Sequence, residues 1–137
     1  MDLSFAKWVE LPNKIDPRGS LTVANPEEIS FPVSRVFYVY GVPENVERAK
    51  HAHRITEQFV IAIRGSFSLD LTDGQNTRTY SMDDPTRGVY VPAMLWDRLY
   101  DFSTDAICLV FASTPYDESD YIRDWDSYLE AMKEIRG

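Results

Sequence analysis

Short apolar runs separated by turn residues dominate the chain between about residues 33 and 113. In residues 66–72 every second position from Phe67 to Leu71 is apolar, and this alternation predicts a strand with one buried face. The turn residues Asp73 and Gly74 follow and predict a hairpin. Comparable runs occupy residues 33–40, 57–63, 77–82, 89–91, 95–102 and 106–113. Many short strands at this spacing are typical of an all-β sandwich or barrel.

The spacing of the apolar residues changes near the end of the chain. Its apolar positions there are Ile122, Trp125, Leu129 and Met132. Steps of three and four residues predict one face of an amphipathic helix, which we expect to begin near Ser119. Acidic residues stand near its beginning and basic residues near its end, where the helix dipole favours each.

The composition is that of one globular domain, and we expect that domain to span residues 1–137. The chain carries 14 basic and 22 acidic side chains, a formal net charge of −8. This charge argues against binding to nucleic acid or to an anionic membrane, because both carry phosphate charge. The longest apolar run, residues 106–112, is too short to span a bilayer, and no leader precedes it. We therefore expect a cytoplasmic protein, in which the single Cys108 is a buried apolar residue without a disulfide partner.

Both histidines of the protein lie in one short basic segment. His51 and His53 are two residues apart, so on a strand their side chains leave the same face. Arg48, Lys50 and Arg54 surround them, which makes a locally basic site in an acidic protein. Imidazoles with an ordinary pKa of about 6.5 suit proton transfer near neutrality, or they can bind a metal. The alternative is that the two histidines lie on the protein surface and have no function.

This segment resembles the first motif of the cupin superfamily, His51-x-His53-x-x-x-Glu57. Metal-binding cupins carry a third histidine in a second motif, of the form Gly, apolar, Pro, then His. The matching stretch here is residues 88–96, and Trp96 stands where that histidine would be. The four-ligand cage is therefore incomplete, and we expect no metal.

A more specific resemblance covers residues 14–129. The blocks that carry it include Arg-x-x-His-Ala-His at 48–53 and Tyr-Asp-Glu-Ser-Asp-Tyr-Ile-Arg at 116–123. In order and spacing they resemble the dTDP-4-keto-6-deoxyglucose 3,4-ketoisomerases, cupin enzymes of bacterial deoxysugar biosynthesis. The resemblance implies a jelly-roll β-barrel with one C-terminal helix. It also implies an isomerase without cofactors that moves the ketone of a dTDP-linked 4-keto-6-deoxy sugar from C4 to C3.

The resemblance assigns proton transfer to the histidine pair. His51 is expected to take the C3 proton, giving an enediolate, and C4 is then protonated by His53, water or Tyr38. Members commonly carry a tyrosine where this chain has Phe37, and many have Gly-Gly where it has Ala49 and Lys50.

Substrate contacts are also implied by the matching blocks. Gln58 is expected to orient a histidine or a sugar hydroxyl, and Trp96 to line the sugar or base pocket. The expected partners of the diphosphate are Arg18, Arg48, Arg64, Arg87 and Arg98. The family further implies a homodimer with exchanged N-terminal strands, and the apolar stretches 3–11 and 21–24 are compatible with pairing at a sheet edge.

Three other functions fit the same sequence features. A 3- or 3,5-epimerase would use the same substrate but leave the ketone in place. A non-catalytic sugar-binding cupin would bind a ligand without turnover. A metal-dependent dioxygenase would need iron, which the missing third histidine disfavours.

Overall fold

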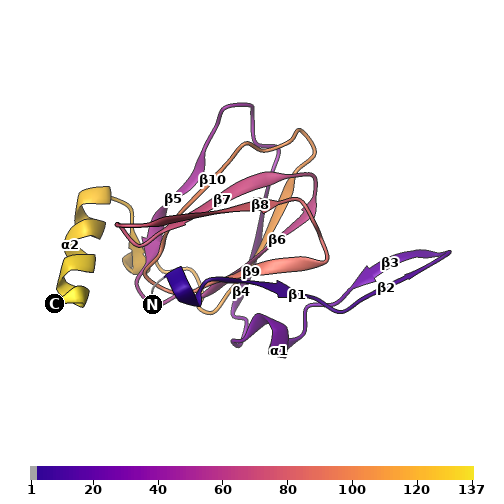
Figure 1. Ribbon diagram of the computed structural model, residues 1–137, viewed down its shortest axis with the longest axis horizontal. Helices are drawn as coiled ribbons and strands as arrows, with labels where there is room; N and C mark the ends of the chain where they lie inside the picture. Colours follow the sequence, from indigo (N-terminus) through magenta and orange to yellow (C-terminus); the bar gives the residue numbers. More distant parts are fainter. Residues whose placement is uncertain (1–2) are drawn as a thin grey trace.

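Two antiparallel five-stranded sheets pack face to face in the computed structural model, which describes residues 3–137 (Figure 1). The first sheet has the order β1 (Lys7–Glu10), β9 (Arg87–Val91), β6 (Gln58–Arg64), β11 (Ile107–Ala112) and β4 (Arg35–Tyr40). The second has the order β12 (Tyr121–Ile122), β5 (Arg48–His53), β10 (Trp96–Tyr100), β7 (Phe67–Thr72) and β8 (Thr77–Met82). The mostly β architecture with a C-terminal helix confirms the predicted fold class.

The core lies between the two sheets, and β7 shows how the sequence builds it. Phe67, Leu69 and Leu71 all point inward and are at most 2% exposed, as their alternation predicts. Cys108 on β11 belongs to the same cluster and is fully buried, which confirms its predicted role as a small apolar residue. Each large apolar side chain buried in this way contributes about 1.5–3 kcal/mol. The core therefore holds the sheets at a fixed separation, and the cavity described below opens between them.

The N-terminal region extends away from this body. After η1 (Leu3–Phe5) and β1 come the hairpin strands β2 (Asn13–Asp16) and β3 (Gly19–Thr22) and the short α1 (Pro26–Ile29). Figure 1 shows the β2–β3 hairpin projecting from the sandwich. Ile15 and Leu21 on it are 74% and 62% exposed. Strand β1 pairs with β9 of its own chain.

The C-terminal helix begins later than the sequence predicts. Helix α2 spans Trp125–Arg136, and Asp124 caps it by accepting a hydrogen bond from the backbone N–H of Ser127. The expected start near Ser119 is wrong, because residues 118–120 form the 3-10 turn η2 and the next two residues form β12, which pairs with β5. Ile122 nevertheless packs with the buried face of α2, which explains the misleading spacing. No helix within residues 3–137 is long and apolar enough to cross a membrane.

Candidate active site

A cavity of about 390 Å³ lies between the two sheets. Its apolar wall comes from core strands on both sides. Its polar and charged lining consists of Glu47, Arg48, His51, Gln58, Asp97, Tyr121 and Arg123. A cavity that combines an apolar wall with convergent polar groups is the usual form of a small-molecule site.

A distortion of β5 places His51 in this cavity. Ala49 and Lys50 have φ angles of 67° and 64°, and the register against β10 shifts at this point. This left-handed conformation costs a residue with a side chain about 1–2 kcal/mol, whereas glycine adopts it freely. This backbone conformation explains why many members of the family resembled carry Gly-Gly at these two positions. The distortion brings His51 opposite Asp97 of β10.

The two histidines form an aromatic cluster with Tyr121. The ring centroids of His51 and His53 are 5.1 Å apart, and the rings are nearly perpendicular at 83°. The Tyr121 ring lies 5.0 Å from His51 and 4.3 Å from His53. His51 lines the cavity, whereas His53 is only 3% exposed and lies behind it.

Asp120 of η2 fixes the orientation of His53. Its carboxyl accepts from the His53 Nδ1 at 2.8 Å, from the backbone N–H of Ile55 at 2.7 Å and from the Thr56 hydroxyl. Burial would raise the pKa of Asp120, but these hydrogen bonds together lower it, so the group is ionised near neutrality. An ionised carboxylate only accepts, so the His53 proton sits on Nδ1 and Nε2 is free to accept a proton. Burial also lowers the pKa of His53 itself.

Asp97 stands in a different environment beside His51. Its Oδ1 is 3.5 Å from the His51 Nε2, and its Oδ2 accepts a hydrogen bond from the Gln58 amide at 3.1 Å. Oδ1 itself has no hydrogen-bond partner within residues 3–137. Burial raises the pKa of Asp97, and burial lowers the pKa of His51. Both directions favour a neutral acid next to a neutral imidazole.

Two arginines supply positive charge at the cavity. Arg48 lines it and forms no ion pair within the described part of the chain. Arg123 lies over the Tyr121 ring at 4.2 Å and donates two hydrogen bonds to Glu118, at 2.7 and 3.0 Å. No group of three or more His, Cys, Asp or Glu side chains within residues 3–137 is arranged to hold a metal.

Comparisons with a family model and with a curated relative agree on the family of this chain. The family model described as "FdtA: WxcM-like, C-terminal" matches residues 4–133. A TDP-4-oxo-6-deoxy-alpha-D-glucose-3,4-oxoisomerase from Aneurinibacillus thermoaerophilus is 35% identical over 130 residues, which cover 94% of each chain. The chain belongs to the 3,4-ketoisomerase family.

Solved structures of ketoisomerases share the whole fold. A 3,4-ketoisomerase from Helicobacter canadensis is 35% identical, with a TM-score of 0.91 over 94% of this chain and 98% of that one. The 3,4-ketoisomerase QdtA from Thermoanaerobacterium thermosaccharolyticum, solved as a mutant in complex with TDP-4-keto-6-deoxyglucose, is 29% identical, with a TM-score of 0.92 over 96% of both chains.

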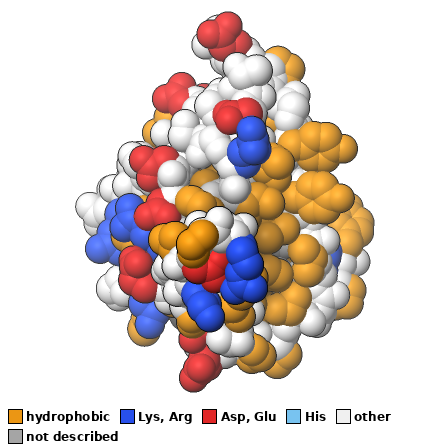
Figure 2. Space-filling model, turned by 90° about the vertical axis from the view of Figure 1, so that its right-hand side faces the viewer, with side chains coloured by type: hydrophobic (Ala, Val, Ile, Leu, Met, Phe, Trp, Pro, Cys, Tyr) orange, Lys and Arg blue, Asp and Glu red, His pale blue; other side chains and the backbone are white. Residues whose placement is uncertain are grey.

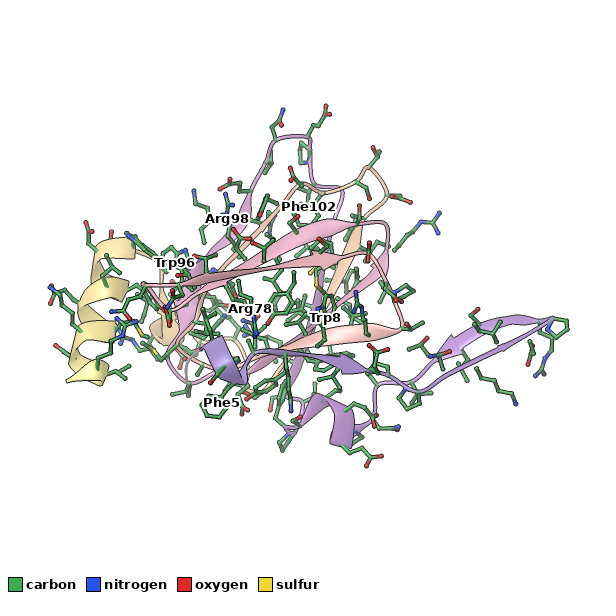
Figure 3. The ribbon with its side chains drawn as sticks, in the orientation of Figure 1. Phe5, Trp8, Arg78, Trp96, Arg98 and Phe102 are labelled. Carbon is green, nitrogen blue, oxygen red and sulfur yellow. The ribbon has the colours of Figure 1, made fainter. Side chains whose placement is uncertain are left out.

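Several residues that the sequence assigned to the ketoisomerase site lie elsewhere in this chain. Tyr38 is 61% exposed and stacks on Tyr40, with ring centroids 5.8 Å apart, on the outer face of β4. The alternation of β4 instead points Phe37 into the cavity. Trp96 packs against Trp125 and Tyr128, beneath α2 (Figure 3). Neither Tyr38 nor Trp96 is among the residues that line the cavity.

The remaining arginine candidates are not among the residues that line the cavity, and each lies against a carboxylate. Arg18, at the tip of the projecting hairpin, pairs with Asp16 at 2.8 Å. Arg64 lies 3.7 Å from Asp105. Arg98 donates to Glu47 and Asp70 at 2.7 and 2.9 Å. Of the predicted binding residues, the structure brings Arg48 and Gln58 to the cavity with His51.

Five polar residues that line the cavity or contact a histidine did not figure among the predicted site residues: Glu47, Asp97, Asp120, Tyr121 and Arg123. Asp120, Tyr121 and Arg123 all lie in the 116–123 block that carries the family resemblance, so that block contained the signal. Asp97 had no such signal, because its partnership with His51 comes from pairing of β5 with β10.

Proposed function

We propose that this ketoisomerase converts dTDP-4-keto-6-deoxyglucose to the 3-keto isomer within the cavity between the sheets. The observation that carries this proposal is a partly buried imidazole, His51, that lines the cavity of a chain 35% identical to a named 3,4-oxoisomerase. The name of that relative and the TDP-4-keto-6-deoxyglucose bound by QdtA both support the substrate.

His51 is the base in this proposal. Because burial lowers its pKa, the imidazole is neutral near pH 7 and can accept the C3 proton. Removal of that proton gives an enediolate, and return of the proton to C4 leaves the ketone at C3. His53 supports the step from behind: Asp120 holds its Nδ1 proton, so its Nε2 can accept or relay a proton.

Arg48 is the proposed anchor of the diphosphate. It is the cavity arginine without an ion pair in residues 3–137, so binding a phosphate breaks no existing bridge. Arg123 is the second proposed partner, and it would have to exchange its bond to Glu118 for one to phosphate. Arg18, Arg64 and Arg98 contribute only if a second subunit brings them to the site.

The surface of the chain supports a homodimer as part of the same proposal. Ile15 and Leu21 on the hairpin and Val36, Tyr38 and Tyr40 on β4 are all more than half exposed. Figure 2 shows hydrophobic side chains gathered over one side of the end of the molecule that faces the viewer. Exposed apolar area of this kind is typical of a protein interface. Light scattering should give a dimer for the native chain and a monomer for Leu21→Asp; a native monomer would contradict the assembly.

Substitution of the base tests the proposed function. His51→Gln should lower turnover of dTDP-4-keto-6-deoxyglucose by about 10²-fold or more, because the amide cannot take up a proton. The affinity for dTDP should change little. Lys50→Gln is the matched control, since Lys50 is the exposed neighbour of His51 and should leave turnover at the native level. Native turnover in His51→Gln would contradict the assignment.

A further inference from the structure

The proposed isomerisation has a second proton transfer that the histidines do not account for. Moving a ketone from C4 to C3 shifts one proton from C3 to C4 and another from the oxygen on C3 to the oxygen on C4. His51 can carry the proton between the carbons. The proton between the oxygens needs a group that can both donate and accept beside the same two carbons.

Few side chains of the cavity can perform this exchange. Arg48 and Arg123 stay protonated, so they donate hydrogen bonds but cannot accept a proton. The amide of Gln58 does not exchange protons with a substrate. Phe37 has no hydroxyl, although it occupies the wall opposite β10. Among the described lining residues, this leaves three hydroxyl or carboxyl groups: Glu47, Asp97 and Tyr121.

Asp97 is the best placed of these three. It is 6% exposed and lies 3.5 Å from the His51 Nε2, so a carbon within reach of His51 has its oxygen near Asp97. Glu47 is instead tied to Arg98 by a 2.7 Å ion pair and is partly exposed. The Tyr121 hydroxyl is directed toward the Arg35 guanidinium, at 3.4 Å.

The hydrogen bonding of Asp97 leaves one oxygen open. Gln58 donates to Oδ2, whereas Oδ1 is buried and has no hydrogen-bond partner within residues 3–137. A buried polar atom without a hydrogen-bond partner destabilises the fold, and a ligand oxygen in the cavity would supply that partner. We propose that Asp97 is a catalytic residue whose Oδ1 carries the proton from the C3 hydroxyl to the C4 oxygen. This inference rests on the proposed function.

The proton and electron balance closes without any other reactant. His51 takes the C3 proton, the electron pair of that bond forms the C3–C4 double bond, and the C4 oxygen receives the proton from Asp97 Oδ1. The C3 hydroxyl then returns its proton to Oδ1, its electrons form the new carbonyl at C3, and the double-bond electrons take the proton from His51 at C4. Asp97 and His51 end in their starting states.

The charges around the pair support the starting state that this scheme requires. Burial raises the pKa of Asp97 and lowers that of His51, and both directions favour a neutral acid beside a neutral base. The other charged groups that act on His51 are His53, Arg123 and Glu118. Glu118 is bound to Arg123, and the two have opposite effects on the pKa of His51. A carboxylic acid held neutral by an apolar site can donate to a developing oxyanion.

Asp97→Asn separates the two proton transfers. The amide keeps the size of the side chain and can still donate a hydrogen bond, but it cannot deliver or take up a proton. With dTDP-4-keto-6-deoxyglucose deuterated at C3, loss of deuterium from C3, whether to solvent or to C4, reports C3–H cleavage, and the 3-keto sugar reports complete isomerisation. We expect the variant to form product about 10²-fold more slowly. Its C3 cleavage should fall much less, so the ratio of cleavage to product should rise at least about tenfold.

The controls make each outcome decisive. Asp126→Asn makes the same change on the exposed face of α2 and should keep the native ratio. Affinity for dTDP, measured by calorimetry, should stay within a few-fold of native in both variants. Native product formation in Asp97→Asn would overturn the inference, and so would an equal fall in cleavage and product, which would mean that Asp97 acts only through His51. A native enzyme that neither cleaves C3–H nor forms product would overturn the proposed function itself, before any variant is compared.

Discussion

Asp120→Asn should reverse the tautomer of His53. In the native site the Asp120 carboxylate accepts from the backbone N–H of Ile55, from His53 Nδ1 and from the Thr56 hydroxyl. The backbone N–H cannot change direction, so the asparagine oxygen should stay at the position of Oδ1. Its NH₂ then replaces Oδ2. The Thr56 hydroxyl can turn to Thr114, which is 2.6 Å away, whereas His53 must move its proton to Nε2.

The magnitude follows from the three hydrogen bonds. A bond to a charged acceptor is worth about 1.5–3 kcal/mol and a neutral one about 0.5–1.5, so each bond that loses the charge loses about 1 kcal/mol. We therefore expect Asp120→Asn to lower the free energy of unfolding by about 2–3 kcal/mol. Turnover should fall by about 10²-fold or more, because a protonated Nε2 of His53 can no longer accept a proton.

Two measurements check this reasoning. Urea unfolding gives the free-energy change, with the exposed Asp126→Asn as the control. Nitrogen-15 NMR gives the tautomer, and the protein has only two histidines, so four ring-nitrogen signals report the whole site. The Nδ1–H signal of His53 should be replaced by Nε2–H. An unchanged tautomer together with a stability loss below about 0.5 kcal/mol would refute the role given to Asp120.

Two further predictions concern stability. Gly65→Ala should lower the free energy of unfolding by several kcal/mol, because Gly65 has a φ of 64° and an added Cβ would overlap its neighbours. Gly41 has the same φ but open space around it, so Gly41→Ala is the control and should lower the free energy of urea unfolding by only about 1–2 kcal/mol. The free energy of unfolding should rise with pH from about pH 5, with a slope of at most about 1.4 kcal/mol per pH unit that falls toward zero near pH 6.5, where the unfolded chain has released half of its histidine protons. In that window both histidines of the unfolded chain bind a proton as the pH falls, whereas burial lowers the pKa of His51 and His53 in the folded chain and so opposes their protonation. The folded chain offsets only one of these two protons, because burial raises the pKa of Asp97. A flat profile there would contradict the lowered histidine pKa values.

The sheet and its inward-facing residues could be predicted because they depend on local alternation. Residues 67–72 form β7 with the buried face that the pattern indicates, and the turn at Asp73 and Gly74 leads into β8. The start of the last helix could not be predicted in the same way. Ile122 fits the helical spacing, but its backbone pairs with β5, and this long-range contact overrides the local pattern.

The candidate site was predictable only in part, and for a related reason. The position of His51 and His53 on one strand could be deduced from their spacing, and the structure places their rings together. Asp97 is distant in sequence and becomes the neighbour of His51 only through the shifted register between β5 and β10. Tyr38 and Phe37 show the limit of the resemblance, because strand alternation decides which of two adjacent aromatic residues enters the cavity.

The central claim is that this chain moves a ketone between adjacent carbons of a dTDP-linked sugar by proton transfer. NMR of dTDP-4-keto-6-deoxyglucose incubated with chelator-treated protein in deuterated water tests it most directly. We predict that the ketone signal moves from C4 to C3. Solvent deuterium at C3 or C5 with the ketone still at C4 would indicate an epimerase and contradict the claim, as would an unchanged spectrum.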